Sequence, residues 1–175
     1  NQFANLLVSA GTETVARLLG WAAVVLDEHP DQRAELAADP ALVPNAVEEL
    51  LRYEAPSPVQ GRWRSRPVQL HGTEVPAGSK VLLLTGSAGR DERAYPDAGR
   101  FDIHRRFDHH LSFGFGIHFC LGAALARLEI RTFFEELLRR VDSLGLVAGA
   151  DPVEMPNAFV YGLASAPMHL SFSRR

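Results

Sequence analysis

The single cysteine of the 175-residue sequence, Cys120, lies in a segment whose composition favours chemistry at its sulfur. Residues 113–122 place two glycines and three phenylalanines before the cysteine, and a long amphipathic helix is predicted to begin directly at it. Backbone amides at a helix N-terminus stabilise a thiolate, which is the form of cysteine that ligates a metal or attacks an electrophile. The alternative is a cysteine that packs as a small apolar side chain in a glycine-rich turn.

Two other segments combine polar residues with helical spacing. Residues 10–14 interrupt an apolar helical pattern with a glycine, two threonines and a glutamate. Because threonine hydroxyls compete for backbone carbonyls and bend a helix, this run predicts a kink. Glu49 and Arg52 lie three residues apart on one face of another predicted helix, where such a pair is most often an ordinary exposed ion pair.

Hydrophobic periodicity predicts how these residues are positioned, in a mainly α-helical protein with small β-sheets, an α+β fold. The predicted elements are a kinked helix at 1–29, a short helix at 31–38, a helix at 44–54, a hairpin-rich β unit at 58–85, an aperiodic loop at 86–122, a helix at 121–141 and a final hairpin at 158–172. The aperiodic loop is longer than loops usually are in compact domains, which indicates a functional segment.

Length and composition are those of one ordinary globular domain, with 46% hydrophobic and 22% charged residues. A net charge of −3 argues against nucleic acid as a partner. One cysteine rules out an intrachain disulfide and favours a cytoplasmic location. No apolar run approaches the length of a membrane span, and residues 1–26 lack the order of a signal peptide, so no membrane association is expected.

Residues 113–122 match the pattern Phe-x-x-Gly-x-His-x-Cys-x-Gly, which resembles the haem-binding loop of the cytochrome P450 family, the haem-thiolate monooxygenases. Two upstream segments occur in the family's order. Residues 49–52, Glu-Leu-Leu-Arg, resemble its Glu-x-x-Arg helix, and residues 10–14 resemble its oxygen-activation segment. The resemblance covers essentially the whole sequence but only the C-terminal portion of the family's fold. It implies that the N-terminal portion lies in a longer polypeptide or on a partner chain.

The resemblance implies haem b, iron protoporphyrin IX, as the cofactor. Cys120 would be the axial ligand of the iron, since a thiolate donates electron density that favours O–O cleavage. His118 and Arg62 are implied to bind the haem propionates, because an arginine–carboxylate pair holds a buried propionate well, and Arg64 is a rival for Arg62 by chain spacing. Further residues would leave space beside the haem or shield the sulfur: Phe113, Gly114, Gly116, Gly122, Ala10 and Gly11.

Other roles follow from the same resemblance. Glu13 and Thr14 resemble the family's catalytic acid–alcohol pair, in which Thr14 would hold the oxygen species and Glu13 would feed protons to it. Glu49 and Arg52 would form a buried structural triad with Arg100, which precedes a phenylalanine as in the family's meander. The positions that correspond to substrate contacts are small or apolar, which suits a hydrophobic substrate, although each is explained equally well as a core residue: Ala10, Ser57, Pro58, Val59, Phe159 and Val160.

Basic residues gather in sequence around the cysteine loop: Arg105, Arg106, His109, His110, Arg127 and Arg131. Such a cluster is usually a solvated face, but on this fold it would steer an acidic ferredoxin or flavodoxin electron donor. The sequence therefore predicts a monooxygenase that uses dioxygen and electrons from a redox partner to oxidise a hydrophobic small molecule. The alternative is a non-catalytic haem-binding scaffold that supports a partner protein. A peroxide-driven variant is disfavoured by the acid–alcohol pair.

Overall fold

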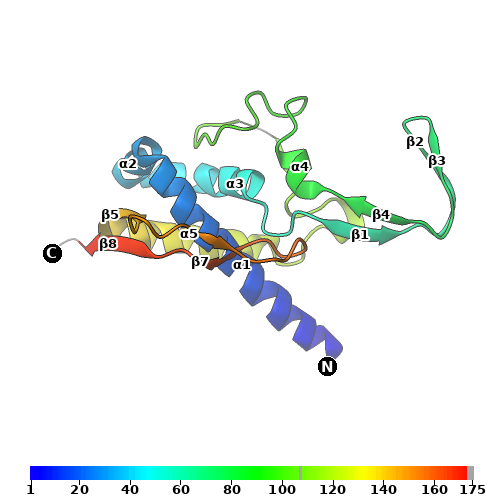
Figure 1. The fold of residues 1–175 in the computed structure, drawn as a ribbon, viewed down its shortest axis with the longest axis horizontal. Coiled ribbons are helices and arrows are strands. Elements are labelled where there is room, and N and C mark those ends of the chain that lie inside the picture. Colours follow the sequence, from blue (N-terminus) through cyan, green and yellow to red (C-terminus); the bar gives the residue numbers. More distant parts are fainter. Residues whose placement is uncertain (107, 173–175) are drawn as a thin grey trace.

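The longest element is the helix α1 (Gln2–Glu28), which crosses the molecule diagonally in Figure 1. The computed structural model describes residues 1–106 and 108–172. The C-terminal half of α1 packs into the core through Leu18, Ala22 and Leu26, whereas residues 1–12 are exposed. The first turns of α1 therefore project from the rest of the chain, as Figure 1 shows.

The hydroxyl groups of α1 make the local bonds that the sequence predicted. Thr12 donates to the carbonyl oxygen of Val8, and Thr14 donates to that of Ala10, each at 2.8 Å. Helical hydrogen bonding continues through these residues, and the kink stays a prediction.

Three further helices complete the core with α1. They are α2 (Pro30–Ala38), α3 (Val43–Tyr53), which follows a 3-10 turn η1 (Pro40–Leu42), and α5 (Ala123–Arg140). Prolines at the first positions of α2, η1 and α3 suit helix starts, because the amide that proline lacks has no partner there. The shared core includes side chains from each helix: Leu18, Val25, Leu36, Val47, Leu50, Ile130 and Phe134.

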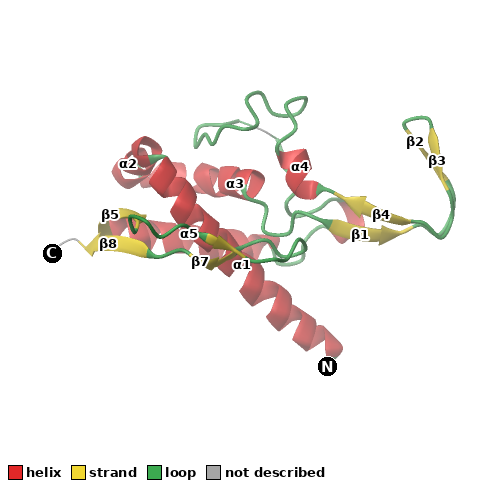
Figure 2. Cartoon of the chain, in the orientation of Figure 1, coloured by secondary structure: helices red, strands yellow, loops and turns green. Residues whose placement is uncertain are grey.

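Two small antiparallel sheets follow α3, as predicted for the β unit. Strands β1 (Gln60–Trp63) and β4 (Lys80–Leu83) pair with Gln60 opposite Leu83. Between them β2 (Val68–Leu70) and β3 (Thr73–Val75) form a hairpin, whose turn uses positive φ angles at His71 and Gly72. Figure 2 shows both pairs extending away from the helices. A short helix, α4 (Thr85–Gly89), comes next and was not predicted.

The prediction of a final hairpin at 158–172 is wrong. Strand β7 (Leu163–Ser165) pairs with β6 (Val153–Glu154), whereas β8 (Met168–Phe172) pairs with β5 (Val141–Leu146). Only residues 166 and 167 separate β7 from β8, and the second of them is a proline, which cannot donate to a strand ladder. The chain therefore leaves one sheet and enters another instead of folding back on itself.

Several large apolar side chains remain exposed on the helices. They lie on the first turns of α1 and along one side of α5: Phe3, Leu6, Leu7, Val8, Leu125, Leu128 and Phe133. None of the helices described is long and apolar enough to cross a membrane. The sequence predicted an apolar face on each of these helices. The chain buries only part of each face, and the exposed residues make up the rest.

Candidate functional site

Cys120 lies in a tightly bonded loop just before α5. Its amide donates to the carbonyl of Phe113 at 2.8 Å, and the Phe119 amide donates to that of Gly116 at 3.0 Å, across the 3-10 turn η2 (Gly116–His118). The Ala123 amide, the first of α5, donates to the Cys120 carbonyl at 3.3 Å. The helix therefore begins three residues after the cysteine, and the loop presents the cysteine side chain as an exposed group.

Two glycines of this loop have a backbone conformation that other residues rarely adopt. The φ angles of Gly114 and Gly116 are +72° and +66°. A Cβ atom at Gly114 would also lie 3.3 Å from the carbonyl oxygen of His118. Gly122 differs, because a Cβ there would meet only the Cys120 sulfur, at 4.0 Å. The loop thus requires glycine at 114 and 116 for its own geometry, in addition to any need of a cofactor.

The surroundings of the sulfur fit the haem that the sequence predicted. Cys120 is exposed among side chains that are apolar and exposed as well: Phe115, Ile117, Phe119, Leu121 and Leu125. A large, mostly apolar macrocycle could cover such a surface, and a thiolate is a suitable ligand for its iron. Phe113, in contrast, is half-buried and packs against the core, with the Arg127 guanidinium 4.5 Å from its ring centre.

Basic groups suitable for propionates are present on β1 and in the loop. Arg62 donates to the neighbouring Gly61 carbonyl at 2.8 Å and forms no ion pair within the described part of the chain, and His118 is exposed. Arg64, which donates to the Arg66 carbonyl at 3.3 Å, has a buried Nε without a partner among the described residues. Arg62 lies on β1 and Arg64 directly follows that strand, so both remain candidates.

Glu49 and Arg52 form a fully buried, bidentate ion pair, not an exposed one. Both Arg52 Nε and a terminal nitrogen lie 2.7 Å from the Glu49 carboxylate, and both side chains are 0% exposed. Arg52 also donates to the carbonyl oxygens of Gly89 and Ala98, at 2.6 and 2.9 Å. A buried charge pair needs such additional bonds to offset desolvation, and these bonds tie the 86–105 segment to α3.

The third member of the triad is Arg105, and the prediction of Arg100 is wrong. Arg105 Nε lies 3.1 Å from the Glu49 carboxylate and its side chain is nearly buried. The Arg100 side chain is 66% exposed, and within residues 1–106 and 108–172 it pairs with Asp102, at 3.4 Å, and not with Glu49. Arg100 does contribute its carbonyl oxygen, which accepts bonds from both Arg52 and Arg105. The backbone turns between residues 100 and 105, so the Arg100 side chain points outward and the Arg105 side chain points toward Glu49.

A second carboxylate on α3, Glu48, anchors the cysteine loop and was not predicted. Arg127 of α5 binds it with two bonds of 2.6 and 2.8 Å, and His110 Nε2 lies 3.0 Å away. Burial alone would raise the pKa of Glu48, but hydrogen bonds from Arg127 and His110 lower it to about 2. The Ser112 hydroxyl donates to the Leu51 carbonyl at 2.6 Å and adds a further tie to α3.

This arrangement changes the interpretation of the basic cluster. Arg105, His110 and Arg127 bind the carboxylates of α3, and His110 is buried. Arg131 is exposed and pairs with Glu135 at 2.6 Å. Half of the predicted cluster is therefore part of the internal framework of the loop and not a free basic face.

The catalytic candidates lie side by side on α1. The Glu13 carboxylate accepts a charge-assisted hydrogen bond of 2.8 Å from Arg17, one turn further along the helix, and the Thr14 hydroxyl donates to the Ala10 carbonyl. Ala10 and Gly11 are exposed, and apart from the neighbouring backbone of α1 no described atom lies within 4 Å of the position of a Gly11 Cβ. The region around Gly11 is therefore open.

The structure brings the two segments of predicted substrate contacts together. The Ser57 hydroxyl donates to the Phe159 carbonyl at 2.9 Å, and the Tyr161 amide donates to the Pro56 carbonyl at 2.9 Å. Pro58 and Val59 are half-buried, and so is Val160, whereas the Phe159 side chain is exposed. Residues 57–59 and 159–160 thus border one another although about 100 residues separate them in the sequence.

Tyr161 connects this region to α1. Its ring stacks on Trp21 with 5.0 Å between the ring centres. Burial, together with the nearby carboxylates of Glu154 and Glu54, raises the pKa of Tyr161 to about 12. The phenol is therefore neutral across the physiological range.

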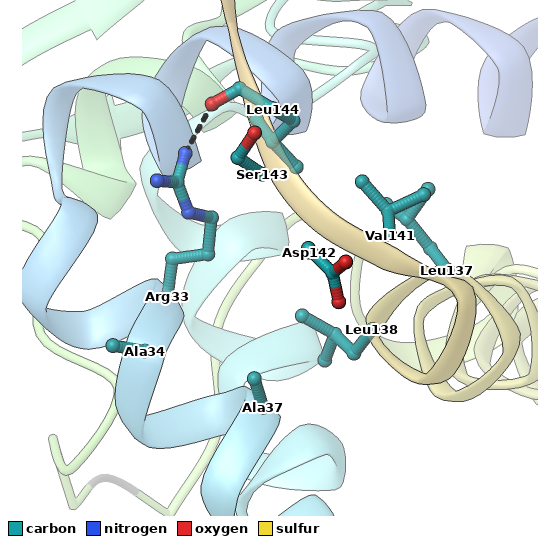
Figure 3. A pocket seen from close by; sticks show the side chains of 9 residues that line it. All are labelled: Arg33, Ala34, Ala37, Leu137, Leu138, Val141, Asp142, Ser143 and Leu144. Carbon is teal, nitrogen blue, oxygen red and sulfur yellow. Dashed lines mark hydrogen bonds between the residues drawn. The ribbon is translucent and has the colours of Figure 1, made fainter. Parts of the chain in front are cut away.

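A small cavity of about 80 Å³ lies elsewhere, between α2, the end of α5 and β5 (Figure 3). Arg33 reaches across it to the Leu144 carbonyl, and its lining contains no residue predicted for the site.

The cytochrome P450 family model matches residues 38–160. Cytochrome P450 monooxygenase PikC from Streptomyces venezuelae is 45% identical over 167 residues, which are 94% of this chain and 40% of PikC. The 6-deoxyerythronolide B hydroxylase of Saccharopolyspora erythraea is 43% identical over 148 residues, 85% of this chain and 37% of the hydroxylase.

Solved structures agree with these matches. Cytochrome P450 CYP109Q5 from Chondromyces apiculatus has a TM-score of 0.92 at 43% identity, over 97% of this chain and 44% of its own. CYP109E1 from Bacillus megaterium in complex with testosterone has a TM-score of 0.91 at 35% identity, over 95% of this chain and 46% of its own. The chain thus spans less than half the length of these relatives. Since the matched residues include both the Glu-x-x-Arg helix and the cysteine loop, the chain belongs to the cytochrome P450 family.

Proposed function

We propose that this chain is part of a haem-thiolate monooxygenase that oxidises a hydrophobic small molecule with electrons from a redox partner. The cofactor of the family is haem bound through a cysteine thiolate. The observation that supports the proposal is the exposed Cys120 thiol, held by a bonded loop in an apolar surface. In the overall reaction one atom of dioxygen enters the substrate and the other leaves as water, with two electrons and two protons consumed.

The residues of the cysteine loop would bind and orient the cofactor. Cys120 would hold the iron as its thiolate, and the haem when bound supplies the redox centre at which dioxygen is reduced. Phe113 would keep water from the sulfur, because its ring already packs between the core and the loop. His118 and Arg62 would bind the propionates through charge-assisted hydrogen bonds.

Thr14 and Glu13 would deliver the protons that the reaction consumes. The Thr14 hydroxyl already donates to a backbone carbonyl, which leaves the lone pairs of its oxygen to accept a bond from a water molecule. The Glu13 carboxylate, one residue away, would relay protons to that water. Replacing Thr14 with alanine should therefore lower the fraction of electrons recovered in product, and an unchanged fraction would contradict the relay.

The substrate surface would be formed where residues 57–59 border residues 159–160. The exposed Phe159 and half-buried Val160 offer apolar contacts that suit a hydrophobic substrate. The relatives described above include a 6-deoxyerythronolide B hydroxylase and a protein solved with testosterone, both of which concern large, mostly apolar molecules. 6-Deoxyerythronolide B and testosterone are therefore the first compounds to test as substrates.

The electron donor would bind near the residues of the basic cluster that do not bind α3. Arg106 and His109 are exposed, and the cavity that they line with Asn45 and Asp108 opens to the surface. An acidic ferredoxin or flavodoxin would meet positive charge at Arg106. The donor should therefore bind more weakly at high salt and to an Arg106→Gln variant.

The exposed apolar residues of α1 and α5 suggest a further partner of the chain. Phe3 and Leu6 on α1 and Leu125 and Leu128 on α5 are each about 60% exposed. A soluble surface rarely leaves so many large apolar residues uncovered. We therefore propose that the N-terminal portion of the same P450 covers them.

The decisive test is the carbon monoxide difference spectrum of the reduced, haem-loaded protein. A thiolate ligand gives a Soret band at long wavelength, and Cys120→Ser should abolish it while Ser112→Ala, which changes a neighbouring structural hydroxyl, should keep it. A protein that binds haem without this band would instead be the non-catalytic scaffold that the sequence left as the alternative.

A further inference from the structure

Arg17 connects the predicted proton donor to the segment that carries the predicted substrate contacts. It lies one helical turn after Glu13, and its terminal nitrogen NH2 is 2.8 Å from the Glu13 carboxylate. Its other terminal nitrogen, NH1, donates to the Leu163 carbonyl at 3.4 Å. The Arg17 side chain is only 19% exposed, compared with 44% for Glu13, so the arginine is the inner member of the pair.

The backbone at Gly162 is shaped around this arginine. A Cβ atom at position 162 would lie 2.9 Å from both Cβ and Cγ of Arg17 and would overlap its Cδ. Gly162 is buried and is not among the glycines with a positive φ, so close approach and not backbone conformation requires glycine there. Only glycine lets the arginine stem lie flat against the 162–163 backbone.

The segment 159–163 is held from both ends. Its first part bonds to residues 56–57 through Ser57 and the Tyr161 amide, and the Tyr161 ring stacks on Trp21 of α1. Its last part contacts Arg17. A displacement of Phe159 or Val160 would therefore move the 162–163 backbone against the arginine that holds Glu13.

We propose that Arg17 is a positioning residue: it fixes where the Glu13 carboxylate lies, and that position depends on the position of the 159–163 segment. The planar guanidinium uses separate nitrogens for the carboxylate and the Leu163 carbonyl, which is a geometry that an ammonium group would not reproduce. Its Nε is buried without a partner among the described residues, so these two contacts are the ones that orient it. Occupation of the substrate surface would thus adjust proton delivery. This inference rests on the proposed role of Glu13.

The linkage is tested first by amide hydrogen exchange in the haem-loaded protein, without turnover. Glu13→Gln should raise exchange of the 161–163 amides severalfold, although the described hydrogen bond of Glu13 is to Arg17 and not to that segment, and Arg17→Gln should raise it at least as much. Once Arg17 is glutamine, adding Glu13→Gln should cause no further increase. If Arg17→Gln raises the exchange and Glu13→Gln leaves it unchanged, the arginine merely holds the segment and the inference is overturned.

The consequence for chemistry is tested from the opposite side of the contact. Gly162→Ala displaces the Arg17 side chain without altering its charge or Glu13, whereas Gly99→Ala adds the same methyl group where no described atom beyond its chain neighbours lies within 4 Å. With testosterone as the probe, Gly162→Ala should raise the fraction of supplied electrons recovered as hydrogen peroxide by about as much as Glu13→Gln does, and Gly99→Ala should not.

The two proposals fail in different ways. If Glu13→Gln itself leaves the hydrogen peroxide fraction unchanged, the proposed proton delivery is wrong, and the exchange experiment still decides whether Arg17 links Glu13 to the segment. If Glu13→Gln raises the fraction but Gly162→Ala and Arg17→Gln do not, proton delivery stands and the positioning role of Arg17 is refuted. Arg17→Lys should keep the pairing with Glu13 but lose the bond to Leu163, which predicts raised exchange of the segment.

Discussion

Replacing Glu48 with glutamine should destabilise the protein at neutral pH, and the loss should shrink in acid. Burial would raise the pKa of this carboxyl, but the bonds from Arg127 and His110 lower it from an ordinary 4.5 to about 2. At about 1.4 kcal/mol for each pKa unit, the shift corresponds to roughly 3 kcal/mol. The Glu48 side chain is 28% exposed, and solvent screening reduces this to about 2 kcal/mol.

The sign of the pH dependence follows from the direction of the shift. Folding lowers the pKa of the Glu48 carboxyl below its value in the unfolded chain. The stabilisation is therefore present above about pH 4.5 and is lost as the pH falls toward 2. A protonated glutamate resembles glutamine, so wild type and Glu48→Gln should converge in acid.

Urea unfolding of the two proteins from about pH 7 down to about pH 3 measures this convergence. Glu129→Gln is the matched control, because Glu129 is exposed on the helix that carries Arg127, and it should stay within about 0.5 kcal/mol of wild type. A difference between wild type and Glu48→Gln that keeps the same size at every pH would refute the reasoning.

Three further outcomes are expected. Arg105→Gln should lower the free energy of unfolding by about 3 kcal/mol because it leaves a buried carboxylate underpaired, whereas Arg100→Gln should change it by less than about 0.5 kcal/mol; equal losses in urea unfolding would restore Arg100 to the triad. Gly114→Ala should cost about 1–3 kcal/mol through its positive φ and reduce the haem bound per protein, and full haem content would count against the loop geometry. Glu154→Gln should lower the pKa of Tyr161 from about 12, which a titration of tyrosinate absorbance measures; an unmoved titration would remove Glu154 as a cause.

The features that the sequence predicted well are those encoded locally. Periodicity located α1, α3 and α5 to within two residues at nearly every end, and the glycines and prolines located the β turns. Residues 113–122 were assigned from their resemblance to the family's haem-binding loop, and the positive φ angles of Gly114 and Gly116 give a local reason for glycine at those two positions. Such features depend on neighbours in the chain, which a single sequence contains.

The failures concern contacts between distant segments. The sequence nominated Arg100 for the triad, but the side chain that reaches Glu49 is Arg105, five residues further on. Glu48 was not singled out in the sequence, because adjacent positions on a helix point about 100° apart and its partner Arg127 lies 79 residues away in the chain. The final hairpin failed because strand pairing across residues 141–172 is non-local. Pro167, between β7 and β8, was a local signal against direct pairing of these two strands.

The adjacent carboxylates of α3 have a consequence for anyone who recombines this protein with its relatives. Glu49 fastens the 86–105 segment and Glu48 fastens the cysteine loop, from consecutive positions of one helix. Inserting or deleting a single residue upstream in α3 would rotate both groups by about 100° and release both segments at once. A chimera that exchanges the cysteine loop alone should therefore fail unless α3 is exchanged with it, and crossover points are safer before Val43 or after Arg140.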